Sequence, residues 1–133
     1  MGVSKSKNGS HRLRPQIFVV DDEPILLELA ENVLAGLECE IRTFTNPQEA
    51  LRTYFEAKRR PDLIITDFAM HEMDGMDLIR ECRRLNPKQK IIMVSGTVDE
   101  NIFSGAPVKP DRFLAKPYQP SALAALAEEL LAD

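Results

Sequence analysis

Five polar side chains of this chain stand at the ends of short apolar runs. They are Asp21, Asp22, Asp67, Ser95 and Lys116. If the fold brings these runs together, the carboxylates meet at one place, where each close pair repels by about 4 kcal/mol at an effective dielectric constant of roughly 20. Positive charge must therefore lie among them. Lys116 supplies one such charge, and the acidic side chains indicate that a cation supplies another.

A magnesium ion suits these side chains because it is a hard cation that takes one or two carboxylates together with water and phosphoryl oxygens. We expect Mn²⁺ to substitute for it. The Ser95 hydroxyl adds a hydrogen-bond donor to the set. Carboxylates, a hydroxyl and an ammonium group form a site for phosphoryl transfer, in which the protein positions the reactants and neutralises charge. The acceptor in this set must be a carboxylate, which predicts an aspartyl phosphate.

The apolar runs that carry these residues are typical of buried β-strands, because they are short and rich in Ile, Val and Phe. They are QIFVVD (16–21), EIRTF (40–44), DLIITD (62–67), KIIMVSG (90–96) and RFLA (112–115). Helical patterns lie between them. This alternation predicts an α/β fold with right-handed crossovers and a doubly wound, five-stranded parallel sheet that helices cover on both faces. Ligands of such sheets collect beyond the carboxyl ends of the strands.

The first two helices have recognisable starts. Pro24 suits the first turn of one helix, and Asn46 can cap the next, with Glu49 placed as in a capping box. The apolar stripe expected to face the core on the first helix is Leu26, Leu29, Ala30, Val33, Leu34 and Leu37. On the second helix, Ala50, Leu51 and Tyr54 are expected to face inward.

A third helix is expected from Gly75 to Leu85, with Leu78, Cys82 and Leu85 on its inner side, and a last one from about Pro120. The stretch between Ser95 and Lys116 is different. It contains Gly105, Pro107 and Pro110, and prolines interrupt helices. Only residues 98–103 are expected to form a helix there, of about one to two turns.

Composition narrows the class of protein. The chain has 133 residues and a net charge of −4, which predicts one domain and argues against a nucleic-acid surface. No long apolar run is present, so no membrane segment is expected. Cys39 and Cys82 form no CxxC pair, which favours a cytoplasmic location. Residues 1–15 are polar and basic, and we interpret them as a disordered leader or an expression remnant before a domain at 16–133. The alternatives for this segment are a basic docking arm and an acylated N-terminus.

Four motifs in this order are similar to those of the receiver domain of two-component response regulators. They are FVVDDEP (18–24), DLIITDFAMHEMDGMDLI (62–79), IIMVSG (91–96) and FLAKPY (113–118), and the resemblance covers nearly all of residues 16–133. It implies a flavodoxin-like sheet with strand order 2-1-3-4-5. It also implies that Asp67 is the phosphoacceptor and that Asp21, Asp22 and the backbone carbonyl of Ala69 help to hold magnesium.

The same resemblance implies roles for three further residues and for the partner. Ser95 is similar to the switch hydroxyl of the family, Phe113 to its switch aromatic, and Lys116 to its phosphate-binding lysine. The Lys116–Pro117 bond is expected to be cis. The phosphoryl donor is expected to be the phosphohistidine of a sensor histidine kinase or of a histidine phosphotransfer protein.

Two departures and two alternatives accompany this interpretation. His71 stands where the family commonly has proline, and we expect it to be an exposed loop residue. The short fourth helix leaves homodimerisation open, because that surface commonly mediates it in the family. The alternatives are a phosphorylation-independent interaction module, which would be expected to lack an acid or the lysine, and a magnesium-dependent small-molecule phosphatase, which would be expected to carry a second acid near Asp67.

Overall fold

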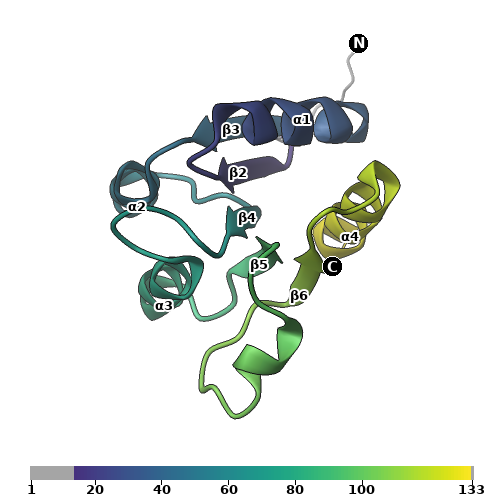
Figure 1. Cartoon of the computed structure of the whole chain (residues 1–133). Coiled ribbons are helices and arrows are strands. Elements are labelled where there is room, and N and C mark those ends of the chain that lie inside the picture. The colour runs from purple at the N-terminus through teal and green to yellow at the C-terminus, as the bar shows by residue number, and fades with distance from the viewer. Residues whose placement is uncertain (1–13, 133) are drawn as a thin grey trace.

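A computed structural model describes residues 14–132 of the chain, so residues 1–13 of the expected leader (residues 1–15) lie outside the described part. Strands and helices alternate along these residues (Figure 1). The strands are β2 (Gln16–Val20), β3 (Glu40–Phe44), β4 (Leu63–Asp67), β5 (Lys90–Ser95) and β6 (Arg112–Ala115). The helices are α1 (Pro24–Leu34), α2 (Pro47–Glu56), α3 (Gly75–Leu85) and α4 (Pro120–Ala132), with 3₁₀ helices η1 (Ala35–Leu37) and η2 (Glu100–Phe103).

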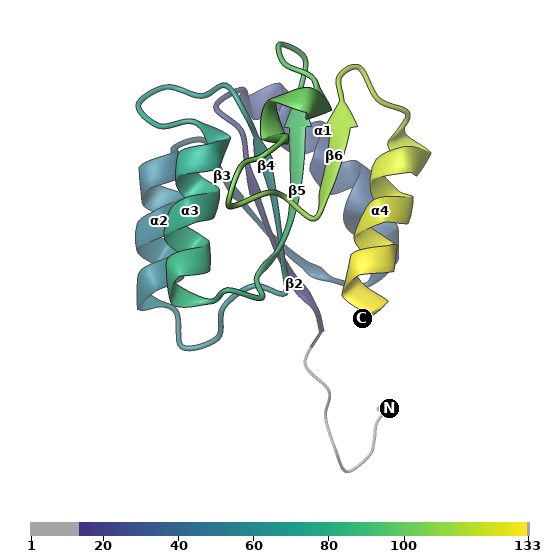
Figure 2. The same ribbon diagram turned by 90° about the horizontal axis from the view of Figure 1, so that it is seen from below.

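All five strands join one parallel sheet in the order β3-β2-β4-β5-β6. Counted along the chain, this is the order 2-1-3-4-5, which confirms the expected flavodoxin-like fold. Helices α1 and α4 cover one face, and α2 and α3 cover the other (Figure 1). The arrowheads of β5 and β6 lie at the same edge of the sheet (Figure 2). Because the strands are parallel, every residue that follows a strand emerges at that edge.

Each face of the sheet has its own core. Alternate residues of the central strands point to opposite faces, as the pleat requires. Thus Ile17 and Ile65 pack with α1 and α4, whereas Phe18 and Ile64 pack with α2 and α3. The strands β4 and β5 are buried along almost their whole length, which explains why their sequences read as continuous apolar runs.

The helix starts agree with the sequence in part. Pro24 opens α1, and the side chain of Asn46 accepts hydrogen bonds from the backbone N–H groups of Gln48 and Glu49 at the start of α2. A reciprocal capping box, which the sequence did not single out, is found on α3. There Asp74 and Asp77 each accept a hydrogen bond from the other's backbone N–H. This box fixes the start of α3 close to the end of β4.

For two residues, the prediction that they face inward is wrong. Leu29 is 53% exposed and Leu85 is 39% exposed, whereas Leu27, outside the expected stripe, is 5% exposed and belongs to the core. The first turns of α1 are apolar nearly all round, with Ile25, Leu26 and Leu27 in succession, so the pattern does not fix which side faces the sheet. Tyr54 and Cys82 are buried as expected, each at 1% exposure.

The region that was expected to form a short fourth helix contains only η2, a single 3₁₀ turn. Its residue Phe103 is buried among the residues of the α2 and α3 face. The connection therefore covers this core with the Phe103 ring and, in part, with Val108. Among residues 14–132, no helix has both the length and the apolar character needed to cross a membrane.

Candidate functional site

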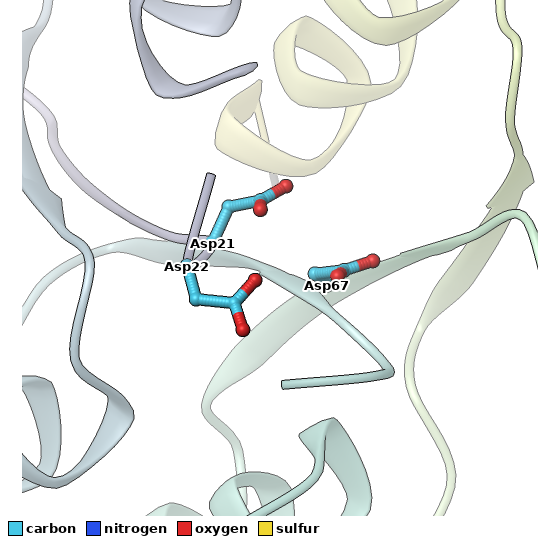
Figure 3. A group of neighbouring side chains, drawn as sticks. All are labelled: Asp21, Asp22 and Asp67. Atoms are coloured by element: carbon cyan, nitrogen blue, oxygen red, sulfur yellow. The ribbon is translucent and has the colours of Figure 1, made fainter. Parts of the chain in front are cut away.

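Three carboxylates meet at the carboxyl edge of the sheet. Asp21 and Asp22 follow β2, and Asp67 ends β4. One carboxylate oxygen from each lies within 4.8 Å of the others, and Figure 3 shows the three side chains gathered around one space. Asp21 and Asp67 are buried, with 7% and 8% of their surface exposed. We call these three residues the acidic triad.

The pairing of β2 with β4 places the acidic triad. In this ladder Val20 lies opposite Thr66, so the residues that come next, Asp21 and Asp67, emerge side by side. The backbone N–H of Asp21 donates to the carbonyl of Phe44 at 3.0 Å, which holds the chain as it leaves β2. The position of the carboxylates is thus set by backbone hydrogen bonds of the sheet.

Lys116 lies immediately after β6 and reaches back to the acidic triad. Its Nζ atom is 3.2 Å from an oxygen of Asp21 and 3.2 Å from an oxygen of Asp67. Its backbone N–H donates to the carbonyl of Ser95 at 2.9 Å, and the Lys116–Pro117 bond is cis, as expected. The ammonium group therefore bridges two acids that originate from different strands.

The site's charges shift the pKa of two groups in ways that follow from burial and neighbours. Burial raises the pKa of the Asp67 carboxyl, the negative charge of Asp21 raises it further, and Lys116 lowers it in part. Burial alone would lower the pKa of Lys116, but the carboxylates of Asp21 and Asp67 outweigh this and raise it. Lys116 therefore stays charged at neutral pH, and it offsets only part of the negative charge around Asp67.

The acidic triad can hold a metal ion. Its donors are carboxylate oxygens, the ligands that hard divalent cations prefer. One ammonium group accompanies three acids, so an added positive charge would relieve the repulsion that raises the pKa of Asp67. The Asp22 side chain is also oriented, because one of its oxygens accepts a hydrogen bond from the backbone N–H of His71 at 3.2 Å.

The other residues singled out from the sequence lie around this centre. Ser95 ends β5 and is buried, and its hydroxyl bonds within the turn that follows. Phe113 lies in β6 opposite Met93, with its ring centroid 5.7 Å from that of Phe103. Ala69 lies two residues beyond Asp67 and is exposed.

His71 is an exposed loop residue, as expected, with 94% of its side chain accessible. The sequence did not reveal its contact with the acidic triad. Its Nδ1 atom lies 3.5 Å from an oxygen of Asp22, in addition to the backbone hydrogen bond. The loop after β4 thus contacts Asp22, one of the two acids that follow β2.

Sequence reasoning missed two residues that support Asp67. The buried hydroxyl of Thr66 donates to the carbonyl of Asp67 at 2.9 Å. Gly75 opens α3 against the same carbonyl, and a Cβ atom at this position would lie 2.6 Å from that oxygen and 2.6 Å from Sδ of Met93. A polar residue in a buried strand was a usable signal for Thr66, whereas the close approach at Gly75 depends on how α3 packs.

An apolar cavity of about 410 Å³ adjoins the site on the α1 and α4 face. Asp21, Asp67 and Lys116 line one part of it, and Leu29 and Tyr118 are among its apolar walls. Burial raises the pKa of Tyr118, with a smaller opposing contribution from Lys116. The carboxyl edge therefore combines a charged centre with accessible apolar side chains.

Comparisons with known protein families and individual proteins agree with one another. Residues 17–128 match the family model described as response regulator receiver domain. The chain is 33% identical to the chemotaxis protein CheY of Thermotoga maritima over 112 residues, which are 80% of this chain and 88% of that protein. It is 29% identical over 116 residues to the sensor kinase CckA of Brucella abortus, covering 86% of this chain and 12% of the kinase.

The fold has close counterparts among solved structures. A response regulator receiver domain protein from Clostridium thermocellum matches with a TM-score of 0.80 and 27% identity, over 89% of this chain and 94% of that one. The chain spans about half the length of several curated transcriptional regulators that it also matches.

Proposed function

Because the chain belongs to the response regulator receiver domain family, we propose that Asp67 accepts a phosphoryl group from a phosphohistidine and that Lys116 holds this group. A receiver domain is a phosphoacceptor in two-component signalling and not a conventional enzyme. The buried carboxylates of Asp21 and Asp67 both lie 3.2 Å from the Lys116 ammonium group. One observation favours Asp67: it ends the central strand β4, between the strand that Asp21 follows and the strand that Ser95 ends.

The transfer step needs little from the protein beyond position and charge. An oxygen of the Asp67 carboxylate attacks phosphorus, and an oxygen–phosphorus bond forms. The bond between phosphorus and the donor's imidazole nitrogen breaks, and its electron pair stays on the imidazole. Lys116 neutralises charge on the transferred group, because its ammonium already lies within reach of Asp67.

The metal is proposed to be Mg²⁺, with Mn²⁺ as a substitute. Asp21, Asp22 and Asp67 would hold it, together with the backbone carbonyl of Ala69. When bound, such an ion neutralises the acids and the phosphoryl oxygens. The pKa of Asp67 supports this proposal, because burial and then the negative charge of Asp21 raise it more than Lys116 lowers it, so a bound cation would favour the ionised carboxylate.

The donor is proposed to be a sensor histidine kinase or a histidine phosphotransfer protein, since receiver domains work with a two-component kinase. The donor must approach the carboxyl edge, where Leu29 and Ile25 expose apolar surface. Such side chains favour contact with another protein. Cys39 and Cys82 are both free and buried, which supports a reducing compartment, and we place the chain in the cytoplasm.

The response to phosphorylation is proposed to pass through Ser95 and Phe113. Ser95 closes the strand next to the one that carries Asp67, and Phe113 lies in the following strand. The Phe113 ring packs on Phe103 of η2. A change in the orientation of the Phe113 ring would therefore displace the connection between β5 and β6. The relative populations of two surface conformations would shift as a result.

Incubation with acetyl phosphate and Mg²⁺, followed by intact mass, tests the proposal. We expect one phosphoryl adduct on the unaltered chain and none on Asp67→Ala. Asp62→Ala is the matched control, because Asp62 precedes the same strand at the opposite edge of the sheet. It should accept the group normally. An adduct that persists in Asp67→Ala would overturn the assignment.

A further inference from the structure

The hydroxyl of Ser95 is engaged on all sides in the turn that follows β5. Its oxygen accepts hydrogen bonds from the backbone N–H groups of Thr97 at 3.1 Å and Val98 at 3.2 Å. It also lies 3.2 Å from the hydroxyl oxygen of Thr97. Ser95 itself is 1% exposed, so bulk water offers it few alternative partners.

The hydrogen-bonding capacity of a serine hydroxyl fixes the direction of the remaining contact. Such a group has two acceptor lone pairs and one donor hydrogen. The two backbone N–H groups occupy both lone pairs of Ser95. Its hydrogen is what remains, and the Thr97 hydroxyl oxygen is the acceptor within reach among the described residues. Ser95 therefore donates to Thr97 in this state.

The position of Ser95 connects this hydrogen to the phosphoryl site. Val94 lies opposite Asp67 in the β4 and β5 ladder, and the carbonyl of Ser95 accepts from the backbone N–H of Lys116. Ser95 thus stands between the strand ends that carry the acceptor and its lysine. Under the proposed function, on which this inference rests, the same hydrogen is the one that a phosphoryl oxygen on Asp67 would take.

We infer that Thr97 is a positioning residue for phosphoryl binding: its hydroxyl holds the single hydrogen of Ser95 in the resting state and competes for it with the phosphoryl group. A hydrogen bond from Ser95 to the charged phosphoryl oxygen is stronger than the bond from Ser95 to Thr97, so Ser95 donates to the phosphoryl group once it is bound. The free energy of the lost bond to Thr97 reduces the free energy gained on phosphoryl binding. Thr97 therefore weakens phosphoryl binding and favours the resting state.

Thr97→Val removes the acceptor and keeps the shape of the side chain. The resting state then leaves the hydrogen of buried Ser95 without this partner, whereas the bound state is unaffected. Beryllium trifluoride stands in for the phosphoryl group on an aspartate, and its affinity can be measured by calorimetric titration in saturating Mg²⁺. We expect Thr97→Val to bind it about two- to tenfold more tightly, the range that one neutral hydrogen bond provides.

Two control variants separate the role of the hydroxyl from a role in folding. Thr97→Ser keeps the hydroxyl and should bind like the unaltered chain. In a Ser95→Ala background, Thr97→Val should change nothing, because the donor is gone. An unchanged affinity for Thr97→Val, or an equal change with and without Ser95, would overturn the inference.

Thermal unfolding gives a second test that does not need the Ser95 variant. Thr97→Val should lower the unfolding temperature of the free protein by more than that of the beryllium trifluoride complex. Equal losses in both forms would show a purely structural role and refute the inference. Failure of the proposed function has a different signature: beryllium trifluoride would not bind the unaltered chain, or would bind Asp67→Ala equally well, and both proposals would then fall.

Discussion

Asp67 is buried and lies next to the carboxylate of Asp21, and both conditions disfavour its ionised form. Both effects raise the pKa of Asp67, and Lys116 removes only part of the rise. Ionising Asp67 therefore costs more free energy in the folded state than in the unfolded chain. A bound metal ion would reduce this cost, so we expect a bound cation to stabilise the folded protein.

The raised pKa predicts how Asp67→Asn should change stability with pH. The folded state binds the Asp67 proton more tightly than the unfolded state, so the contribution of this group is fully present below the unfolded pKa and is lost as pH rises through the folded pKa. In metal-free buffer at pH 7, we expect Asn at this position to raise the free energy of unfolding. Below the ordinary pKa of 3.8, this advantage should disappear.

Urea unfolding of both proteins from acid to neutral pH measures this difference. The test uses no activity, so it does not depend on a phosphoryl donor. A gap that stays constant across the pH range, or an Asn variant that is less stable at pH 7 without metal, would contradict the electrostatic description of Asp67.

Lys116 is expected to have opposite effects on metal binding and on phosphoryl transfer. Its ammonium group lies 3.2 Å from two of the acids, so it repels a cation held by them while it attracts a phosphoryl group. Lys116→Met should raise Mg²⁺ affinity by on the order of tenfold, because unit charges several Å apart near a protein surface interact by roughly 1 to 4 kcal/mol. Phosphorylation by acetyl phosphate should become much slower.

The matched control is Lys88→Met, which removes the same charge from the exposed loop before β5, at the opposite edge of the sheet. Calorimetric titration with Mg²⁺ compares the variants at equal net charge. If both raised the affinity equally, the effect would come from net charge, and the assigned place of Lys116 in the site would be wrong.

Residue types and order were enough to predict that the acidic triad and Lys116 meet. Parallel strands end at one edge, so polar residues that follow buried runs must converge there. The supporting residues could not be found in this way. Thr97 matters through the direction of one hydrogen bond, and Gly75 matters through the absence of a side chain beside one oxygen. The role proposed for Thr97 and the close approach at Gly75 cannot be inferred from residue type alone.

At the scale of elements, the start of α3 supports the end of β4. The backbone N–H of Gly75 donates to the carbonyl of Phe68 at 2.8 Å, and the space beside it is filled by the Asp67 carbonyl and by Met93. A side chain here would force one of these elements to move. The helix start and the acceptor strand therefore form one packing unit.

Gly75→Ala tests this packing. Its Cβ atom would lie 2.6 Å from the Asp67 carbonyl oxygen, and overpacking of this kind costs about 1–3 kcal/mol. We expect lower stability in urea and slower phosphorylation by acetyl phosphate. Gly36→Ala is the control, because a Cβ atom there meets nothing within 4 Å. A Gly75→Ala variant as stable and as reactive as Gly36→Ala would contradict the close approach.

The connection between β5 and β6 is irregular, but its far end is fixed. One oxygen of Asp111 accepts from the backbone N–H of Ile91 at 2.7 Å and from the Arg83 guanidinium at 2.8 Å. Arg83 also donates to the carbonyls of Gln89 and Lys109. These bonds tie α3 to the start of β6. The strand that carries Phe113 and delivers Lys116 is thereby held in register without a long helix before it.

Asp111→Ala should therefore destabilise the protein by about 1–3 kcal/mol, the range for leaving a buried donor unsatisfied. Hydrogen exchange should accelerate at the Ile91 amide. Glu129→Ala is the control, because it breaks an exposed ion pair. The side chains of Arg112 and Glu129 are 45% and 55% accessible, and such pairs contribute little to the free energy of unfolding. Equal effects of the two variants would show that Asp111 does not anchor the connection.

The existence and approximate positions of the elements were predictable because their hydrophobic periods differ clearly. Which side of a helix faces the sheet was less so. Ile25, Leu26, Leu27 and Leu29 crowd the first turns of α1, and burial selects Leu27 while leaving Leu29 exposed. Pro107 and Pro110 correctly predicted that no full helix precedes β6, since proline has no backbone N–H to donate, and Gly105 adopts a positive φ.

At the scale of the molecule, the alternation of elements predicts a parallel sheet but not the order of its strands. Several orders satisfy right-handed crossovers, and the motif resemblance supplied the order that the structure confirms. What the chain signals to is a separate matter. Some relatives extend well beyond the matched region, as in the sensor kinase CckA, of which the match covers 12%. The acidic triad and Lys116 all lie within the described residues.

Locating the phosphoryl group on the chain is the most direct test of the site. After reaction with acetyl phosphate and Mg²⁺, sodium borohydride reduces an aspartyl phosphate to an alcohol, and peptide mass spectrometry identifies the altered residue. We predict that the alteration lies at Asp67, requires Mg²⁺ and is strongly reduced in Lys116→Met. Alteration at Asp21, at Asp22 or outside the acidic triad, or an equal yield without a divalent cation, would contradict the proposed chemistry.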